Sequence, residues 1–177
     1  EQAVERAASA LNDVCASGGG VGVVIGADLT NEDIWAATHF ARNVLKLRGA
    51  HTTEIAPHTP HPIIALMAEQ ATRLAKAEYG GTMRLGAYAC RVRHGTIAAA
   101  AYAGSSWVER TYANGDVSIR ERHRHRYEFH NRYRDRCAAA GMTFAGVNPE
   151  RDLVEIIELP RAVHPFFVGV QFHPELT

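Results

Sequence analysis

The sequence predicts an α/β fold in a single domain spanning residues 1–177, and three observations support this. Helical periodicity and short apolar runs alternate in the first half of the chain, whereas strand-like runs dominate after Gly81. No internal repeat, low-complexity segment or linker separates the two halves. With 177 residues, 46% of them hydrophobic and 21% charged, the chain has the length and composition of a globular domain with one core.

The first half is predicted to contain helices around a buried strand. Apolar residues recur at helical spacing over residues 3–16 and again over 31–47. Between these two segments, residues 21–27 are almost wholly apolar, as in a strand that is buried on both faces of a parallel sheet. The Thr- and Pro-rich stretch 51–61 predicts a loop, and residues 62–77 are predicted to be helical.

The second half is predicted to be rich in strands. The predicted strands are 83–92, 117–128, 142–147, 153–159 and 166–172. Two helices are expected among them, a short Ala-rich one near residues 96–102 and a longer one over 131–140 that ends at Gly141.

Composition excludes several classes of function. The formal net charge is zero, so bulk charge suggests no polyanionic partner, and the apolar runs are too short to span a bilayer. The first residues, EQAVERAASAL, show no signal peptide. Three widely spaced cysteines (Cys15, Cys90 and Cys137) indicate reduced thiols rather than disulfides or a zinc site. Together these features predict a cytoplasmic protein with no metal of its own.

The stretch VGVVIGADLTNEDIWAATHF, residues 21–40, predicts a strand, a sharp turn and a helix. Many enzymes carry a nucleophile at such a turn. Thr30, however, precedes the helical pattern with Asp33 three residues later, which is typical of a helix N-cap. We therefore interpret Thr30 as a cap rather than as a nucleophile, because an internal Thr would need an adjacent base.

The sequence QFHPE near the end of the chain places His173 and Glu175 two residues apart. Residues at this spacing at a strand end project to the same side. A carboxylate can then hold the imidazole in one tautomer, as in the His–acid half of a catalytic triad. The alternative is a turn without a catalytic role.

The segment 120–136 contains seven arginines and only three acidic residues. Strand alternation predicts Arg122, Arg124 and Arg126 on one face and His123 and His125 on the other. Three interpretations are open: a solvated ion-paired edge, a carboxylate or phosphate site, and a nucleic-acid surface. In the third, the stacking platforms would be Tyr127, Phe129 and Tyr133.

Several motifs together resemble the class I glutaminase (glutamine amidotransferase) domain of CTP synthase. They are AHTTEIAP, GGTMRLGAYAC, ERHRHRYEFHNRYRD, LVEIIELP and HPFFVGVQFHPEL, and the similarity runs almost continuously over residues 40–176. The resemblance implies a three-layer, flavodoxin-like α/β sheet with flanking helices. We expect it to be incomplete at both ends, because the family's first strands, Gly-rich oxyanion loop and closing helix have no counterpart in the sequence.

The resemblance also implies a mechanism, in which a Cys attacks the side-chain amide of glutamine and ammonia passes to a synthetase domain that aminates UTP. His173 and Glu175 fall on the triad's His and Glu, Glu54 on the glutamine-binding Glu, and Arg126 on an Arg that holds the substrate. An acid and an Arg would suit the ammonium and carboxylate ends of glutamine.

The sequence departs from the family at the nucleophile. Aligning the residues from Ala41 backwards puts Thr30 at the family's Cys, whereas aligning the apolar run puts Val24 there. Cys15 does not fit the turn, and Glu32 or Asn31 in place of a small residue argues against a tight elbow.

Three functions follow from these patterns: an active glutaminase, a relative without catalysis that keeps a ligand pocket or a subunit contact, and a nucleic-acid module. We expect the nucleophile to be absent and glutamine hydrolysis to be at most a trace. The expected partners are glutamine or a similar amino acid and a synthetase domain or subunit, with neither a membrane nor nucleic acid, and homo-oligomers are compatible with this. No cofactor is expected in this chain, because ATP and Mg would belong to the synthetase domain.

Overall fold

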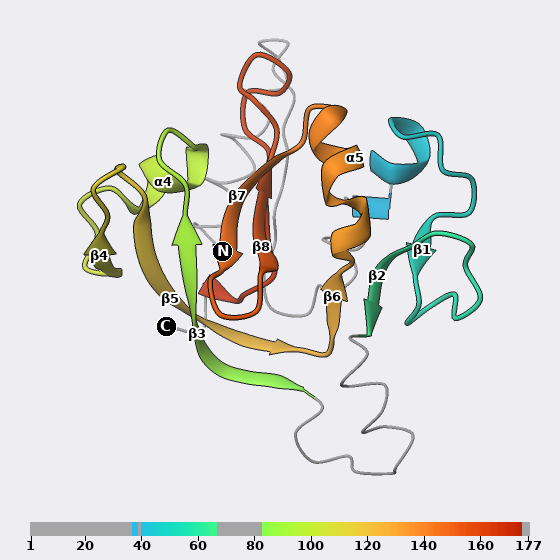
Figure 1. Cartoon of the computed structure of the whole chain (residues 1–177), viewed down its shortest axis with the longest axis horizontal. Helices are drawn as coiled ribbons and strands as arrows, with labels where there is room; N and C mark the ends of the chain where they lie inside the picture. The colour runs from blue at the N-terminus through green and yellow to red at the C-terminus, as the bar shows by residue number, and fades with distance from the viewer. Residues whose placement is uncertain (1–36, 39, 67–82, 175–177) are drawn as a thin grey trace, which may run out of the picture.

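The computed structural model describes residues 37–38, 40–66 and 83–174, whose strands form two sheets (Figure 1). The three-stranded sheet has the order β1 (His51–Thr52), β2 (Pro62–Leu66) and β6 (Tyr127–Phe129). The six-stranded sheet has the order β4 (Val108–Thr111), β5 (Val117–His125), β3 (Arg84–Val92), β7 (Thr143–Asn148), β8 (Leu153–Glu158) and β9 (Val168–Val170). The pair β1–β2 is parallel, and the other pairs in the described sheets are antiparallel.

Helical segments connect and cover the strands. They are α4 (Ile97–Tyr102), the 3-10 turn η1 (Asn131–Tyr133) and α5 (Arg134–Ala139), and residues 40–43 are also helical. Helix α4 begins after Thr96, whose side chain accepts a hydrogen bond from the backbone N–H of Ala99, as an N-cap does. This mixture of helices and strands confirms the predicted α/β class.

A long ribbon formed by β3 and β5 links the two sheets (Figure 1). The strands pair over their whole length, from Arg84 opposite His125 to Val92 opposite Val117. The chain bends at Arg126, and β6 then joins β2 in the other sheet. Arg126 therefore lies at the single residue where the chain passes from one sheet to the other.

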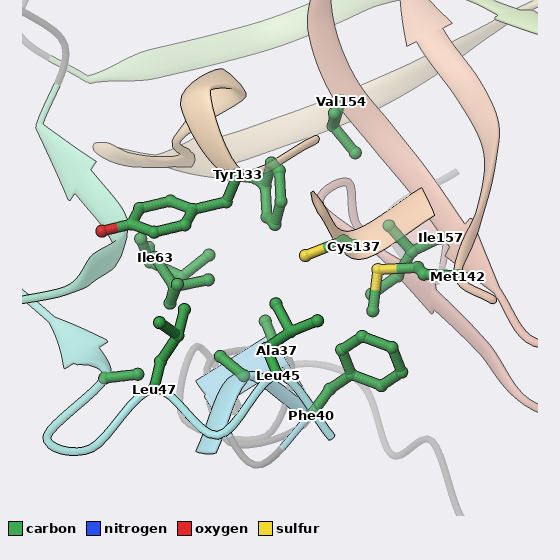
Figure 2. Close-up of a cluster of buried hydrophobic side chains, with 14 residues drawn as sticks. Ala37, Phe40, Leu45, Leu47, Ile63, Tyr133, Cys137, Met142, Val154 and Ile157 are labelled. Atoms are coloured by element: carbon green, nitrogen blue, oxygen red, sulfur yellow. The ribbon is translucent and has the colours of Figure 1, made fainter. Parts of the chain in front are cut away.

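Two hydrophobic clusters hold these layers together. The larger lies between residues 37–47, β2, α5 and β8, with Phe40, Ile63, Cys137 and Ile157 pointing toward one another (Figure 2). The smaller lies against the six-stranded sheet and contains Cys90, Val92, Ile119, Ile156 and Phe172.

Strand β7 can approach its neighbours only because residue 146 is Gly. A Cβ at Gly146 would stand 2.5 Å from Ile156 Cγ1 and 2.7 Å from Cys90 Sγ, which is closer than real atoms pack. Cys90 and Cys137 are both buried and free, so the prediction of reduced thiols is confirmed for these two residues.

Most of the second-half predictions are confirmed within one to three residues. The predicted strands 83–92, 142–147, 153–159 and 166–172 correspond to β3, β7, β8 and β9, and the two predicted helices correspond to α4 and to η1 with α5. The predicted segments 3–16 and 21–27 and the Thr30 cap lie outside the described residues.

The prediction of a helix beginning at residue 62 is wrong, because residues 62–66 form strand β2. Ile63 and Ile64 are buried between β1 and β6, and a short apolar run of this kind looks the same in a buried helix and in a buried strand. The rest of that prediction, 67–77, lies outside the described residues. The predicted loop 51–61 contains the two-residue strand β1, and the exposed edge strand β4 was not predicted.

Candidate active site

The structure describes three of the predicted site residues, which come from separate parts of the chain. Glu54 follows β1 and is exposed, Arg126 is the bend residue, and His173 follows β9. Glu175, Thr30 and Val24 lie outside the described residues, so the structure does not show whether they join this group.

Glu54 and Arg126 both act on the phenol of Tyr127. Burial raises the pKa of Tyr127, the negative charge of Glu54 raises it further, and the positive charge of Arg126 opposes the shift. A carboxylate and a guanidinium therefore both influence the phenol of one aromatic residue. The Nε atom of Arg126 is buried and has no hydrogen-bond partner within the described ranges.

His173 reaches this region because the chain crosses from β9 back to β5. The backbone N–H of Gln171 donates to the carbonyl of Glu155 at 2.9 Å, and the N–H of His173 donates to the carbonyl of Arg122 at 2.8 Å. Phe172 between them is buried and contacts the ring of His123, with centroids 5.8 Å apart. An electrostatic interaction with His173 is among the influences that lower the pKa of His125.

A buried polar network lies behind the bend. Arg84 Nη2 donates to Glu155 Oε1 at 2.6 Å, and its Nη1 donates to Glu128 Oε1 at 3.5 Å. The Nε2 atom of His123 lies 2.8 Å from Glu155 Oε2. The hydroxyl of Tyr102 donates to Glu121 Oε1 at 2.7 Å.

The pKa shifts in this network come mainly from burial. Burial raises the pKa of Glu128 to about 7, although the guanidinium of Arg84 opposes the shift. Burial lowers the pKa of His125 to about 3, and electrostatic interactions with His123, Arg84 and His173 lower it further. Glu128 is therefore easily protonated at neutral pH, whereas His125 is neutral there.

The predicted alternation along β5 is correct, but it ends one residue early. Arg122 and Arg124 are exposed, and His123 and His125 are buried on the opposite face. Arg126 does not share the outer face, because the bend removes it from the strand. Two of the three predicted stacking platforms are wrong, because Phe129 and Tyr133 are buried in the larger hydrophobic cluster, whereas Tyr127 is partly buried against it.

Sequence reasoning missed the buried partners of this site. Glu128 and the two inner histidines belong to a motif that the sequence analysis singled out, but no role was given to them. Arg84 and Glu155 are far from that motif in the sequence, and nothing in a single sequence pairs them. The available signal was the alternation along β5, which places Glu121, His123 and His125 on the face opposite the arginines.

A separate hollow of about 460 Å³ lies near α4 and is lined by Arg93, His94, Thr96, Glu158, Pro160 and Arg161, among others. The Glu158 carboxylate accepts the N–H groups of Ile97 and Ala98, so it occupies the N-terminal end of α4. Neither Glu54, Arg126 nor His173 lines this hollow.

Among the described residues, no helix is long and apolar enough to cross a membrane.

The family model for class-I glutamine amidotransferases matches residues 37–177, and the chain belongs to this family. Within it, the chain is a glutaminase-type domain of the CTP synthase kind, as the following relatives indicate.

The CTP synthase of Halalkalibacterium halodurans is 49% identical over 142 residues, which are 80% of this chain and 24% of that protein. The CTP synthase of Frankia casuarinae is 48% identical over 136 residues, 76% of this chain and 20% of that protein. The solved glutaminase domain of Trypanosoma brucei CTPS with bound acivicin is 28% identical, with a TM-score of 0.66 over 81% of this chain and 50% of that one. The chain therefore spans about a quarter or less of the length of the two bacterial CTP synthases and half of the solved chain.

Proposed function

We propose that this chain binds glutamine, or a closely similar amino acid, without hydrolysing it. The observation that carries the binding half of the proposal is the Nε of Arg126, which is buried without a hydrogen-bond partner among the described residues. Glu54 and Arg126 also both influence the pKa of Tyr127. A buried donor without a partner costs free energy, and a ligand carboxylate would recover it. Glu54 would then receive the ammonium group, in agreement with the roles implied by the family resemblance.

The second half of the proposal, the loss of catalysis, rests on the thiols. The two possible alignments place Thr30 or Val24 at the position where the family has its nucleophilic Cys, and neither alignment places a Cys there. Burial raises the pKa of Cys90 well above its ordinary value and raises that of Cys137 to about 11. Buried thiols that remain protonated are poor nucleophiles, so neither can replace the missing Cys beside His173.

The family's synthetase reaction, from UTP to CTP, would require a further domain or subunit. We propose that this partner supplies the ATP and Mg sites and that the present chain contributes ligand binding or a contact to it. This proposal is independent of the binding test below, which uses the chain alone.

Calorimetric titration with L-glutamine tests the binding half. We expect Arg126→Ala to weaken the affinity by at least about tenfold, because a charge-assisted hydrogen bond contributes about 1.5–3 kcal/mol. Arg124→Ala is the matched control, because it removes the same charge two residues away from an exposed position. Equal affinities of the two variants, or no heat with the wild type, would reject the proposed pocket.

Ammonia release from glutamine tests the catalytic half. We expect no release above the blank from the wild type, and the same result from His173→Ala. Turnover by the wild type that His173→Ala abolishes would show that another nucleophile serves His173, and would overturn the proposed loss of catalysis while leaving the binding proposal intact.

A further inference from the structure

Arg126 lies at a one-residue break between two strands, so its position depends on the backbone there. Strand β5 ends at His125 and β6 begins at Tyr127, so Arg126 alone forms the bend between the two sheets. A small change of direction at this residue would move its guanidinium group relative to Glu54. A side chain that fixes the bend would therefore also fix the candidate ligand-binding group.

The imidazole of His125 spans this bend. Its Nδ1 lies 3.0 Å from the backbone carbonyl oxygen of Tyr127. A carbonyl oxygen can only accept, so Nδ1 must carry the proton and donate it. One side chain thus connects the backbone on the two sides of Arg126, and that side chain is only 8% exposed.

The surroundings of His125 keep this donor in place. The buried Oε1 of Glu128 lies 3.7 Å from Nδ1 and is itself held by Arg84, while the ring of His123 lies 5.2 Å away. Because the pKa of His125 is lowered to about 3, the ring is neutral at physiological pH. Its Nε2 is then an unprotonated acceptor, and this atom is buried with no hydrogen-bond partner among the residues that the structure describes.

These contacts distinguish His125 from the other histidine of the inner face. Both ring nitrogens of His123 face acceptor oxygens, the Glu121 carbonyl and the Glu155 carboxylate, so His123 is tied into the network on both sides. Among the described residues, His125 forms a hydrogen bond through Nδ1 only, to the backbone carbonyl of Tyr127 after Arg126. This hydrogen bond therefore constrains the bend rather than the buried network.

We propose that His125 is a positioning residue for ligand binding: by donating from Nδ1 to the Tyr127 carbonyl, it fixes the bend that directs Arg126 toward the region of Glu54. This inference rests on the proposed function, because it assigns the purpose of the bend to glutamine binding. In this role His125 does not touch the ligand and transfers no proton.

Two substitutions of similar size separate this role from simple packing. His125→Asn keeps a donor close to the position of Nδ1, whereas His125→Leu fills the space without a donor. By calorimetric titration with L-glutamine at pH 7.5, we expect His125→Asn to bind within about threefold of the wild type, and His125→Leu to bind at least about tenfold more weakly. Equal affinities of the two folded variants would overturn the inference.

A double-mutant cycle shows whether His125 acts through Arg126. If it does, His125→Leu should weaken binding much less in an Arg126→Ala background than in the wild type. Additive losses would mean that His125 affects the site by another route, and would also overturn the inference.

A measurement without ligand keeps the two proposals distinguishable. The Arg126 Nε–H group is buried, so we expect its ¹H–¹⁵N signal to be observed and protected in the wild type and in His125→Asn, and to be lost or shifted in His125→Leu. If the wild type binds no glutamine but this pattern holds, the proposed function fails while the positioning of Arg126 by His125 stands. An unchanged signal in His125→Leu would reject the positioning itself. Should His125→Leu fail to fold, a His125→Asn variant that folds but has lost the signal and the binding would equally reject it.

Discussion

The two faces of strand β5 carry similar residues in opposite environments. On the outer face, Arg120, Arg122 and Arg124 are exposed, and the residues opposite them on β3 are Ala89, Ala87 and Leu85. On the inner face, the ionisable side chains of residues 121, 123 and 125 are buried. The alternation of the strand therefore divides one charged sequence into a solvated half and a buried half.

Ion pairs on the two faces are therefore expected to contribute differently to the free energy of unfolding. Arg120 forms an ion pair with Glu109 at 2.9 Å, but both side chains are about half exposed and water screens them. On the inner face, Arg84 and Glu155 are almost completely buried and have exchanged water for each other. Removing one member of a buried pair leaves an uncompensated charge, whereas removing an exposed charge returns its partner to water.

The largest expected effect is that of Glu155→Leu. The carboxylate of Glu155 contacts both Arg84 and His123. Its loss leaves the buried guanidinium of Arg84 with the longer contact to Glu128 and the ring of Tyr88. We expect the free energy of unfolding to fall by about 3–5 kcal/mol, measured by urea denaturation.

The double variant Arg84→Met with Glu155→Leu is the matched control. It replaces both charges with apolar groups, so it should be markedly more stable than Glu155→Leu alone. A single variant that loses less than about 1 kcal/mol would mean that water reaches this pair, and the contrast between the two faces would then be wrong.

A pH-dependent effect of intermediate size is expected from Glu128. Its pKa is raised from 4.5 to about 7 in the folded protein, because burial disfavours the charged form. A raised pKa contributes stability that is fully present below the unfolded value of 4.5 and is lost as the pH rises through about 7. The shift corresponds to about 3 kcal/mol at most.

The test compares the wild type with Glu128→Gln between pH 5 and pH 8. The amide imitates the protonated acid, so the wild type should lose up to about 3 kcal/mol of unfolding free energy relative to this variant as the pH rises. Arg84, Arg151, Glu155 and His125 also face Glu128, and His125, with a pKa of about 3, does not titrate in this range. Glu150→Gln, at an exposed position, should run parallel to the wild type. Parallel curves for Glu128→Gln would show that Glu128 is ionised throughout.

Much of this contrast could be predicted from the sequence, because it depends on a local rule. The period of two along ERHRHRYE assigns the arginines and histidines to opposite faces, and the structure agrees up to His125. The bend at Arg126 could not be predicted, since it arises where β6 leaves the ribbon to pair with β2. The same long-range pairing explains the error at residues 62–66, whose apolar run forms a strand because β1 and β6 flank it.

The candidate site was predicted from the resemblance more than from physical chemistry. The matching motifs pointed to Glu54, Arg126 and His173, which are separated by more than a hundred residues in total. The layer behind them was missed because Arg84, Glu128 and Glu155 lie on three different strands. Burial of a charged residue depends on its partners, and a single sequence does not show which residues those are.

The smallest expected effect is on the outer face. Arg120→Ala should change the free energy of unfolding by no more than about 0.5–1 kcal/mol, because the pair with Glu109 is exposed on both sides. In a double-mutant cycle with Glu109→Ala, the coupling energy should be about 0.2–1 kcal/mol and should shrink in 1 M NaCl, since salt screens exposed charges. A larger coupling that salt does not reduce would mean that this face is shielded from water in solution. The two faces of β5 would then differ in their partners rather than in their exposure, because the outer arginines would also have exchanged water for a protein surface.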